Sequence, residues 1–196
     1  MKEIYLPITQ SILDTYKNYL YPFLYSIYAM TDNAFCYADR SGVAVKIILN
    51  PKLRSTAQKE SGMSAKSFND HIAPDVVLCQ DEFVCLMPLQ VWEAWIKFLN
   101  QQHKRSWNSW TKLFCYVYFQ CSRHTGCSFT HSREQFAKSL EMQPASVSEK
   151  LIILEQCGFI MRTNYNADQG IARAYSLPEK YWPEYRILEK QKLSTK

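Results

Sequence analysis

The sequence lacks the features that would mark a membrane protein or a secreted protein. Its apolar runs are short and interrupted by polar residues, so no span of about 18 residues is apolar enough to cross a bilayer. The first residues, from Met1 to Tyr5, have no apolar core of the kind that a secretion signal needs. We therefore expect a cytoplasmic protein that has no membrane partner.

Motifs of common enzymes are also missing. The chain has only 5 glycines in 196 residues, and none of them forms a Gly-rich phosphate loop. A Gly-x-Ser-x-Gly elbow, a His-Glu-x-x-His motif and a paired-carboxylate motif are likewise absent from the sequence. We predict no enzymatic activity, no catalytic residue and no cofactor. The 13 tyrosines leave one alternative open, a tyrosine nucleophile that acts on DNA.

The seven cysteines are an odd number without a tight framework, which is typical of a reducing compartment rather than of a disulfide scaffold. Zinc is the metal that the cysteines and histidines of this chain could bind, because thiolates and imidazoles suit zinc. Its candidates lie within 17 residues and are Cys115, Cys121, His124, Cys127 and His131. They include no Cys-x-x-Cys pair, and two of them fall inside a predicted helix. We therefore predict no metal site.

The composition of the chain is that of a protein that can fold, and the second half of the chain is basic. Hydrophobic residues make up 47%, aromatic residues 14% and charged residues 21%, as in a globular protein with a real core. Residues 1–91 carry eight Lys/Arg and nine Asp/Glu, a net charge of −1. Residues 92–196 carry fifteen and nine, a net charge of +6. This asymmetry favours an anionic partner for the second half.

One stretch in that half has the pattern of helix, tight turn and helix. Ser132–Leu140 is a predicted helix because Ser132 can cap its first turn and apolar residues recur along one face. Pro144 lies where proline is tolerated, in the first turn of a second helix. There Val147, Leu151 and Leu154 form an apolar stripe that faces the first helix. Gly158 can end the second helix in the left-handed conformation.

Two strand-like runs follow, Phe159–Met161 and Ala172–Leu177, joined by the polar loop from Asn164 to Gly170. The order of helix, turn, helix and ribbon resembles the winged helix-turn-helix superfamily. The specific part of the resemblance is Leu151-x-x-Leu154-x-x-x-Gly158-Phe159-Ile160 followed by the ribbon, and it covers about the last 75 residues. It implies a second helix that enters the major groove of DNA and a wing that contacts the backbone. A substantial minority of such domains bind only proteins.

The first half repeats this order more weakly. Helix 53–60, a turn at Ser61–Ser64 and helix 65–72 are followed by a predicted hairpin of Asp75–Leu78 with Phe83–Met87. The resulting hypothesis is an internal duplication, two winged helices in tandem. Ahead of it, residues 8–31 form an aromatic segment in which Pro22 should break or restart a helix near Tyr21, which gives either two helices or one kinked helix. Two further strands are predicted at Ala34–Tyr37 and Val43–Leu49.

Between the two copies, apolar spacing predicts a helix of about three turns within Gln90–Leu99. A polar and basic connector follows at residues 101–107, and Ser109 is expected to cap a helix at Trp110–Ser122. The tail has a predicted helix at Glu184–Lys192. The fold class is thus α+β and mainly α, with two tandem winged-helix domains joined by an aromatic helix. Their predicted bounds are residues 1–100 and 101–196.

The residues expected to contact DNA are polar or basic and lie off the apolar stripe, on the wing, on the preceding helix or in the first copy. Acidic neighbours in the first copy leave open whether that copy contacts DNA or protein, because acids repel phosphates. The full set is Gln143, Ser146, Ser148, Lys150, Arg162, Asn164, Asn166, Arg173, Arg133, Lys138, Lys52, Arg54 and Lys66.

The leading functional hypothesis is sequence-specific binding of double-stranded DNA. Two contexts fit, transcription regulation and replication initiation on a plasmid, phage or other mobile element, since the overall plan is similar to tandem winged-helix plasmid initiators. The alternative is a protein-interaction module that acts as an adaptor or inhibitor of a host complex. A continuous basic stripe over Arg133, Lys150, Arg162 and Arg173 would support DNA. A homodimer and a host protein are further candidate partners.

Overall fold

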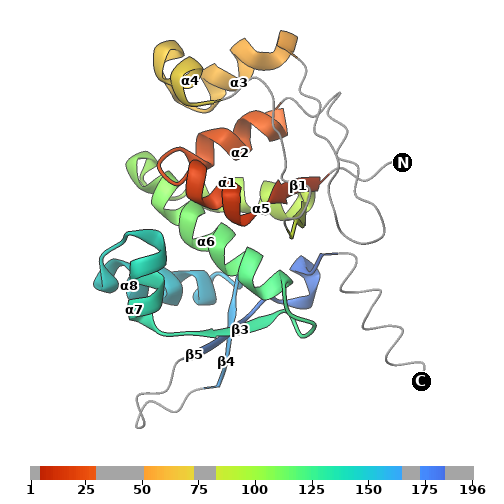
Figure 1. Ribbon diagram of the computed structural model, residues 1–196, viewed down its shortest axis with the longest axis vertical. Helices are drawn as coiled ribbons and strands as arrows, with labels where there is room; N and C mark the ends of the chain where they lie inside the picture. The colour runs from red at the N-terminus through yellow and green to blue at the C-terminus, as the bar shows by residue number, and fades with distance from the viewer. Residues whose placement is uncertain (1–4, 30–50, 73–82, 165–172, 184–196) are drawn as a thin grey trace, which may run out of the picture. The chain divides into compact units, whose positions relative to one another are not determined.

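The computed structural model describes residues 5–29, 51–72, 83–164 and 173–183 (Figure 1). These ranges form a mainly helical α+β protein with eight α-helices and two small antiparallel sheets. No helix among them is long and apolar enough to span a membrane. Contacts divide the chain into two compact units, residues 1–112 and 113–196, which we call unit 1 and unit 2. The division falls inside helix α6 (Trp107–Ser122).

Unit 1 begins with strand β1 (Tyr5–Ile8) and the helices α1 (Gln10–Thr15) and α2 (Leu20–Ala29). The two helices are separated by a turn, so the predicted break exists, but it precedes Tyr21. Pro22 lies in the first turn of α2, where the missing N–H of proline costs no helical hydrogen bond.

The next part of unit 1 is a helix, a turn and a helix, as predicted. Helix α3 (Arg54–Glu60) follows a short 3-10 turn, η2 (Pro51–Leu53), and α4 (Ala65–His71) follows a turn that contains Gly62 at a φ of +75°. The hydroxyl of Ser64 accepts a hydrogen bond from the Ser67 N–H at 3.1 Å and caps α4. Inward-facing side chains of both helices are fully buried.

Strand β2 (Cys85–Pro88) pairs antiparallel with β1, so that Tyr5 lies opposite Pro88 and Ile8 opposite Cys85. The sequence predicted neither β1 nor this long-range partner for β2. The expected hairpin strand at residues 75–78 lies outside the described residues. So do the expected strands at residues 34–37 and 43–49 and the expected tail helix at residues 184–192.

Helix α5 (Leu89–Leu99) confirms the predicted aromatic helix, and it buries Trp92 and Trp95 completely. After the connector, a 3-10 turn, η3 (Lys104–Ser106), leads directly into α6. The expected start at residue 110 was therefore wrong. Ser109 lies inside α6, where its hydroxyl donates to the Ser106 carbonyl at 2.8 Å instead of capping the helix.

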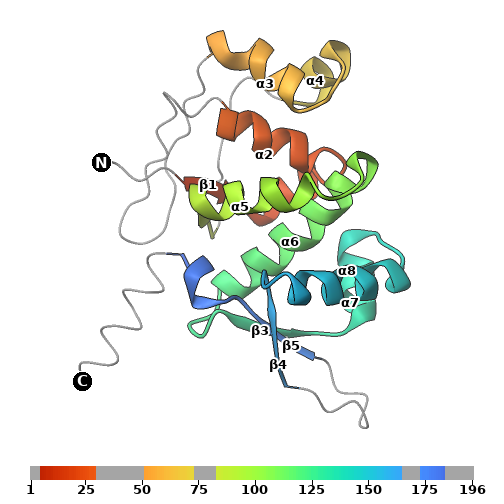
Figure 2. The same ribbon diagram turned by 180° about the vertical axis from the view of Figure 1, so that it is seen from behind.

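Unit 2 contains, after α6, strand β3 (Ser128–His131), helices α7 (Arg133–Leu140) and α8 (Pro144–Gln156), and strands β4 (Met161–Asn164) and β5 (Arg173–Ser176). Strand β5 lies between β3 and β4 and is antiparallel to both. Figure 2 shows the same unit from behind, with the helices α7 and α8 beside the sheet. The sequence missed β3. It also placed β4 two residues too early, because Phe159 and Ile160 are buried core residues that precede the strand.

The ends of α7 and α8 follow from local chemistry. Ser132 and Gln135 form a capping box at the start of α7, which satisfies two backbone N–H groups. Glu141 ends α7 in the left-handed conformation, at a φ of +51°. Gly158 does the same after α8, and the Phe159 N–H then donates to the Leu154 carbonyl at 2.9 Å. The left-handed residues Glu141 and Gly158 thus allow a short turn between the two helices and a sharp exit toward β4.

Candidate nucleic-acid interface

Helix α8 presents two faces of opposite character. Val147, Leu151 and Leu154 are buried and form the predicted stripe. The outward face, at helical spacing, consists of Ala145, Glu149, Ile152 and Gln156, all of them exposed. Ile152 is 42% exposed although it is a large aliphatic residue. The surface of α8 that points away from the core thus carries one acid and no cation.

The polar residues predicted to contact bases therefore lie at different positions around α8. Gln143 precedes the first turn and is exposed, and its side chain makes no capping bond. Ser146, Ser148 and Lys150 lie on the flanks and are half-buried. Burial lowers the pKa of Lys150, and the nearby Glu149 carboxylate opposes this change. Of these four residues, only Gln143 is exposed.

Two predicted backbone contacts, Arg133 and Lys138, are exposed on α7. Arg133 bonds to its neighbour Glu134, with 2.8 Å between Nη2 and Oε1, and both side chains are more than half exposed. An exposed pair of this kind is worth little in free energy and is easily exchanged for a phosphate. Both α7 cations are thus accessible to an anionic partner.

The two arginines of the β4–β5 ribbon differ from each other. Arg162 on β4 is held by Glu155 of α8, with both guanidinium contacts made to Oε2. This pair is half-buried and ties the strand to the helix. Arg173 on β5 is exposed. Asn164 ends β4, whereas Asn166 lies outside the described residues.

The predicted basic stripe is therefore interrupted. Arg133 and Arg173 are exposed, but Arg162 bonds to Glu155 and Lys150 is half-buried beside Glu149. The charge asymmetry also shrinks when it is counted by structural unit. Residues 1–112 carry twelve Lys/Arg and ten Asp/Glu, and residues 113–196 carry eleven and eight, net charges of +2 and +3. Four cations that the sequence assigned to the second half belong to unit 1.

In unit 1 the three predicted contacts also separate. Lys52 and Lys66 are exposed. The guanidinium of Arg54 donates to the Ile72 carbonyl at 2.7 Å and lies 4.9 Å above the ring of Phe68. Arg54 thus joins the beginning of α3 to the end of α4. The Arg54 side chain therefore stabilises the packing of α3 against α4, and its contact with DNA stays a prediction.

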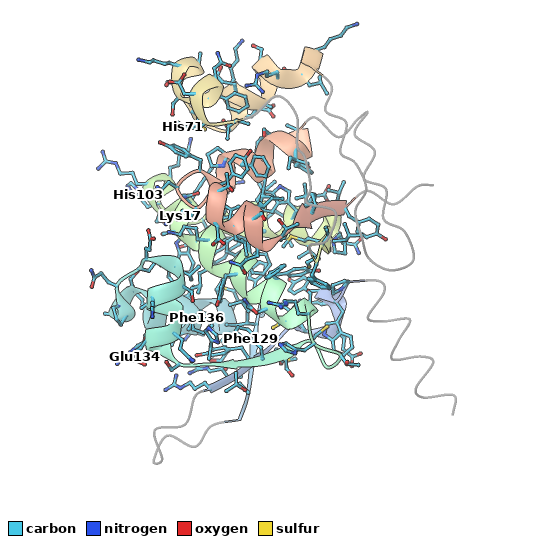
Figure 3. The ribbon with its side chains drawn as sticks, in the orientation of Figure 1. Lys17, His71, His103, Phe129, Glu134 and Phe136 are labelled. Carbon is cyan, nitrogen blue, oxygen red and sulfur yellow. The ribbon has the colours of Figure 1, made fainter. Side chains whose placement is uncertain are left out.

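The sequence did not predict a chain of polar contacts among α6, β3 and α7. The Tyr116 hydroxyl of α6 lies 3.1 Å from His131 Nε2 of β3 and 3.3 Å from Ser139 Oγ of α7. His131 is also the cross-strand partner of Arg173. The chain connects three elements around the aromatic core, in which Phe129 and Phe136 are labelled in Figure 3. No local motif signals it, because the partners are distant in sequence.

Three of the four cysteines of unit 2 belong to its core, and the fourth, Cys157, is exposed. Cys115, Cys121 and Cys127 are buried, and the thiol of Cys121 lies 3.7 Å from the Tyr175 carbonyl. In the part of the chain that the structure describes, no three His, Cys, Asp or Glu side chains gather in a way that could hold a metal ion. Comparison with models of protein families, with curated proteins and with solved structures found no match.

Proposed function

We propose that unit 2 is a winged helix that binds double-stranded DNA with sequence preference. The order of helix, strand, helix, helix, strand, strand supports this proposal, as does a sheet in which β5 lies between β3 and β4. In such a domain the second helix of the pair enters the major groove and the ribbon touches the backbone. Here these elements are α8 and the β4–β5 ribbon.

The observation that carries the proposal is the set of exposed polar groups on α7, at the start of α8 and on the β4–β5 ribbon. Gln143 stands at its beginning, the cations Arg133 and Lys138 lie on the preceding helix, and Arg173 lies on the ribbon. An amide can pair with adenine, and the three cations can pair with phosphates. Glu149, on the outward face, can accept a hydrogen bond from the N4 amino group of cytosine.

We further propose that unit 1 is a second and more divergent copy. Ala57 and Phe68 are buried at the positions that correspond to Ala137 and Val147 in unit 2, and each pair bridges a helix, a turn and a helix. The two turns differ, since Gly62 supplies the positive φ in unit 1 and Glu141 supplies it in unit 2. Transcription regulation and replication initiation are both compatible with two DNA-binding copies.

A second candidate is a protein-interaction role. Two large hydrophobic side chains in the described part of the chain are exposed, Ile152 on α8 and Met161 on β4, at 42% and 43%. They belong to the same helix and ribbon that would meet DNA, and Glu155 already neutralises Arg162 there. An apolar and partly acidic surface of this kind fits a protein partner better than a phosphate backbone.

Titration of the full chain with labelled random duplex DNA at several salt concentrations, followed by selection of bound sequences, tests the proposal. We expect Arg173→Ala to weaken binding to all sequences alike and to flatten the slope of log affinity against log salt by about one unit. Lys180→Ala, which removes an exposed cation outside the proposed interface, is the matched control. Wild-type protein that binds no duplex even at low salt contradicts the DNA proposal.

The contribution of the outward face of α8 is tested separately. If Glu149 contacts cytosine, Glu149→Gln should change the selected sequence at one position, with a loss of about 1–3 kcal/mol for the original base. If Glu149 only repels phosphates, the same change should tighten binding to every sequence. If Ile152→Ser weakens binding of a protein partner and leaves duplex binding unchanged, the second candidate is favoured. A palindromic selected site would support the predicted homodimer.

A further inference from the structure

The chain contains a long run that is free of acidic residues. From Ala94 to Arg133, forty residues carry six Lys/Arg and three of the four histidines but no Asp or Glu. A stretch of this length would hold about four acids at the average composition of the chain. Its most exposed part in unit 1 is the connector between α5 and α6, which carries His103, Lys104 and Arg105, all exposed.

The connector is held in one shape by its own hydrogen bonds. The Gln102 N–H donates to the Leu99 carbonyl at 2.8 Å, and the Ser106 N–H donates to the His103 carbonyl at 2.9 Å. The indole N–H of Trp107 closes the loop by donating to the Gln102 carbonyl at 3.2 Å. The cations are therefore presented on a fixed turn, which lowers the entropy lost when a ligand binds.

A second segment of unit 1 is tied to the same place. The side chain of Asn108 donates to the Lys17 carbonyl at 2.9 Å and accepts from the Tyr21 N–H at 3.0 Å. The rings of Tyr21 and Trp107 also meet edge to face, with 5.1 Å between their centroids. Figure 3 shows Lys17 and His103 at the same edge of unit 1. The turn between α1 and α2 thus adds Lys17 to the cationic group.

The acids of unit 1 that the structure describes are engaged elsewhere or lie on other elements. Asp14 accepts a hydrogen bond from Gln10 on α1, and Glu60 accepts one from Tyr25. Burial raises the pKa of Tyr28, and a hydrogen bond and charge interaction with Glu93 raise it further, so Glu93 is engaged with that tyrosine. Asp70 belongs to α4. Within the described ranges, no ion pair joins an acid to Lys104 or Arg105.

From this charge pattern and geometry we propose that the connector, with His103, Lys104, Arg105 and the adjacent Lys17, is a second contact for the phosphate backbone of duplex DNA. It acts on phosphates, and contacts to phosphates carry no information about the base sequence. The inference rests on the proposed DNA binding, but it places a contact in unit 1 that the helix-turn-helix pattern does not include.

The test is a salt series with the full chain and random duplex DNA. We expect Lys104→Gln/Arg105→Gln to flatten the slope of log affinity against log salt by about two units, since each lost phosphate contact removes roughly 0.9. The sequence selected by the protein should not change. Lys59→Gln/Lys180→Gln removes two exposed cations outside the connector and is the matched control. Thermal melts of both variants verify that they fold.

Each outcome decides between the two proposals. If wild-type protein binds duplex and the connector variant matches the control variant, the connector proposal is overturned and the proposed function stands. If the connector variant loses binding but a variant with Arg133, Lys138 and Arg173 all changed to Gln does not, the connector stands and the interface on unit 2 falls. Wild-type protein that binds no duplex at any salt concentration overturns both.

Discussion

At the residue scale, Leu154 and Ile152 lie close together on α8, but one is buried in the core and the other is exposed to solvent. Leu154 is fully buried, whereas Ile152, two positions earlier, is 42% exposed. The sequence shows both as aliphatic residues in the run Leu151-Ile-Ile-Leu154, and only the helical period separates them. The contrast supplies a matched pair of substitutions with similar chemistry and different surroundings.

Leu154→Ala should lower the free energy of unfolding by roughly 2–5 kcal/mol, because it removes a buried side chain and leaves a cavity. Ile152→Ala should change it by less than about 0.5 kcal/mol, as surface substitutions usually do. Urea denaturation of both variants provides the measurement. Equal effects would show that the register assigned to α8 is wrong.

Tyr21 gives a prediction for alkaline solution. It is 4% exposed, and burial, with smaller effects from Tyr25 and Glu60, raises its pKa well above the usual range for tyrosine. The unfolded chain releases the phenol proton near pH 10, while the folded chain retains it. A raised folded-state pKa therefore means that stability is lost as the pH rises above about 10, by at most ~1.4 kcal/mol per pH unit for one group.

Tyr21→Phe should remove this contribution and leave the protein less sensitive to alkali. Urea melts of wild type and variant at pH 8 and above pH 10 measure the difference between them. If the gap in unfolding free energy between the two proteins is the same at both pH values, the assignment to Tyr21 is incorrect.

At the element scale, the start of α7 rests on one serine. The Ser132 hydroxyl accepts from the Gln135 N–H at 3.1 Å, and the Gln135 side chain accepts from the Ser132 N–H at 2.6 Å. Ser132→Ala should cost about 1 kcal/mol of unfolding free energy, the usual value of an N-cap. Ser55→Ala, an exposed position inside α3, should cost nothing because alanine is a better helix former. A chemical melt in which both serine variants lose the same free energy would argue against the cap.

The predictability of the elements follows from how local their causes are. Helices α7 and α8 were predicted because their caps, Pro144 and the apolar stripe all lie within the elements themselves. Strand β3 was not predicted because Phe129 is the only buried residue among its four, so the sequence shows no alternation of apolar and polar residues there. The bond from Arg162 to Glu155 could not be foreseen either, because it depends on where β4 begins after the exit at Gly158.

At the scale of the whole molecule, α6 contributes to the cores of both units. Trp110 and Thr111 are buried in unit 1, where Trp95 donates to the Thr111 hydroxyl at 3.1 Å. Leu113 and Phe114 are buried in unit 2, where Phe114 meets Phe159 at 5.4 Å between centroids. The sequence placed the boundary in the connector because composition changes there. Composition cannot show that the buried residues of one continuous helix are divided between two units.

This arrangement predicts the behaviour of fragments. A fragment of residues 1–122 should unfold cooperatively, whereas a fragment of residues 1–100 should be much less stable because it lacks Trp107, Asn108, Trp110 and Thr111. The fragment 101–196 retains the whole of α6 and should fold. Circular dichroism melts of the three fragments provide the comparison. Equal melting of the fragments 1–100 and 1–122 would show that unit 1 is complete without α6.

The pairing of β1 with β2 also has a consequence for how fast the protein folds. Its partners, such as Ile8 and Cys85, are far apart in the chain, and every α-helix from α1 to α4 lies between them. Closing so long a loop costs roughly 2 kcal/mol more entropy than closing a hairpin of about ten residues. Because helices form in about a microsecond, we expect the closure of this loop to be slower than the formation of the helices. During synthesis β1 leaves the ribosome before β2, and we expect its edge to be open to pairing with other strands until β2 has been made.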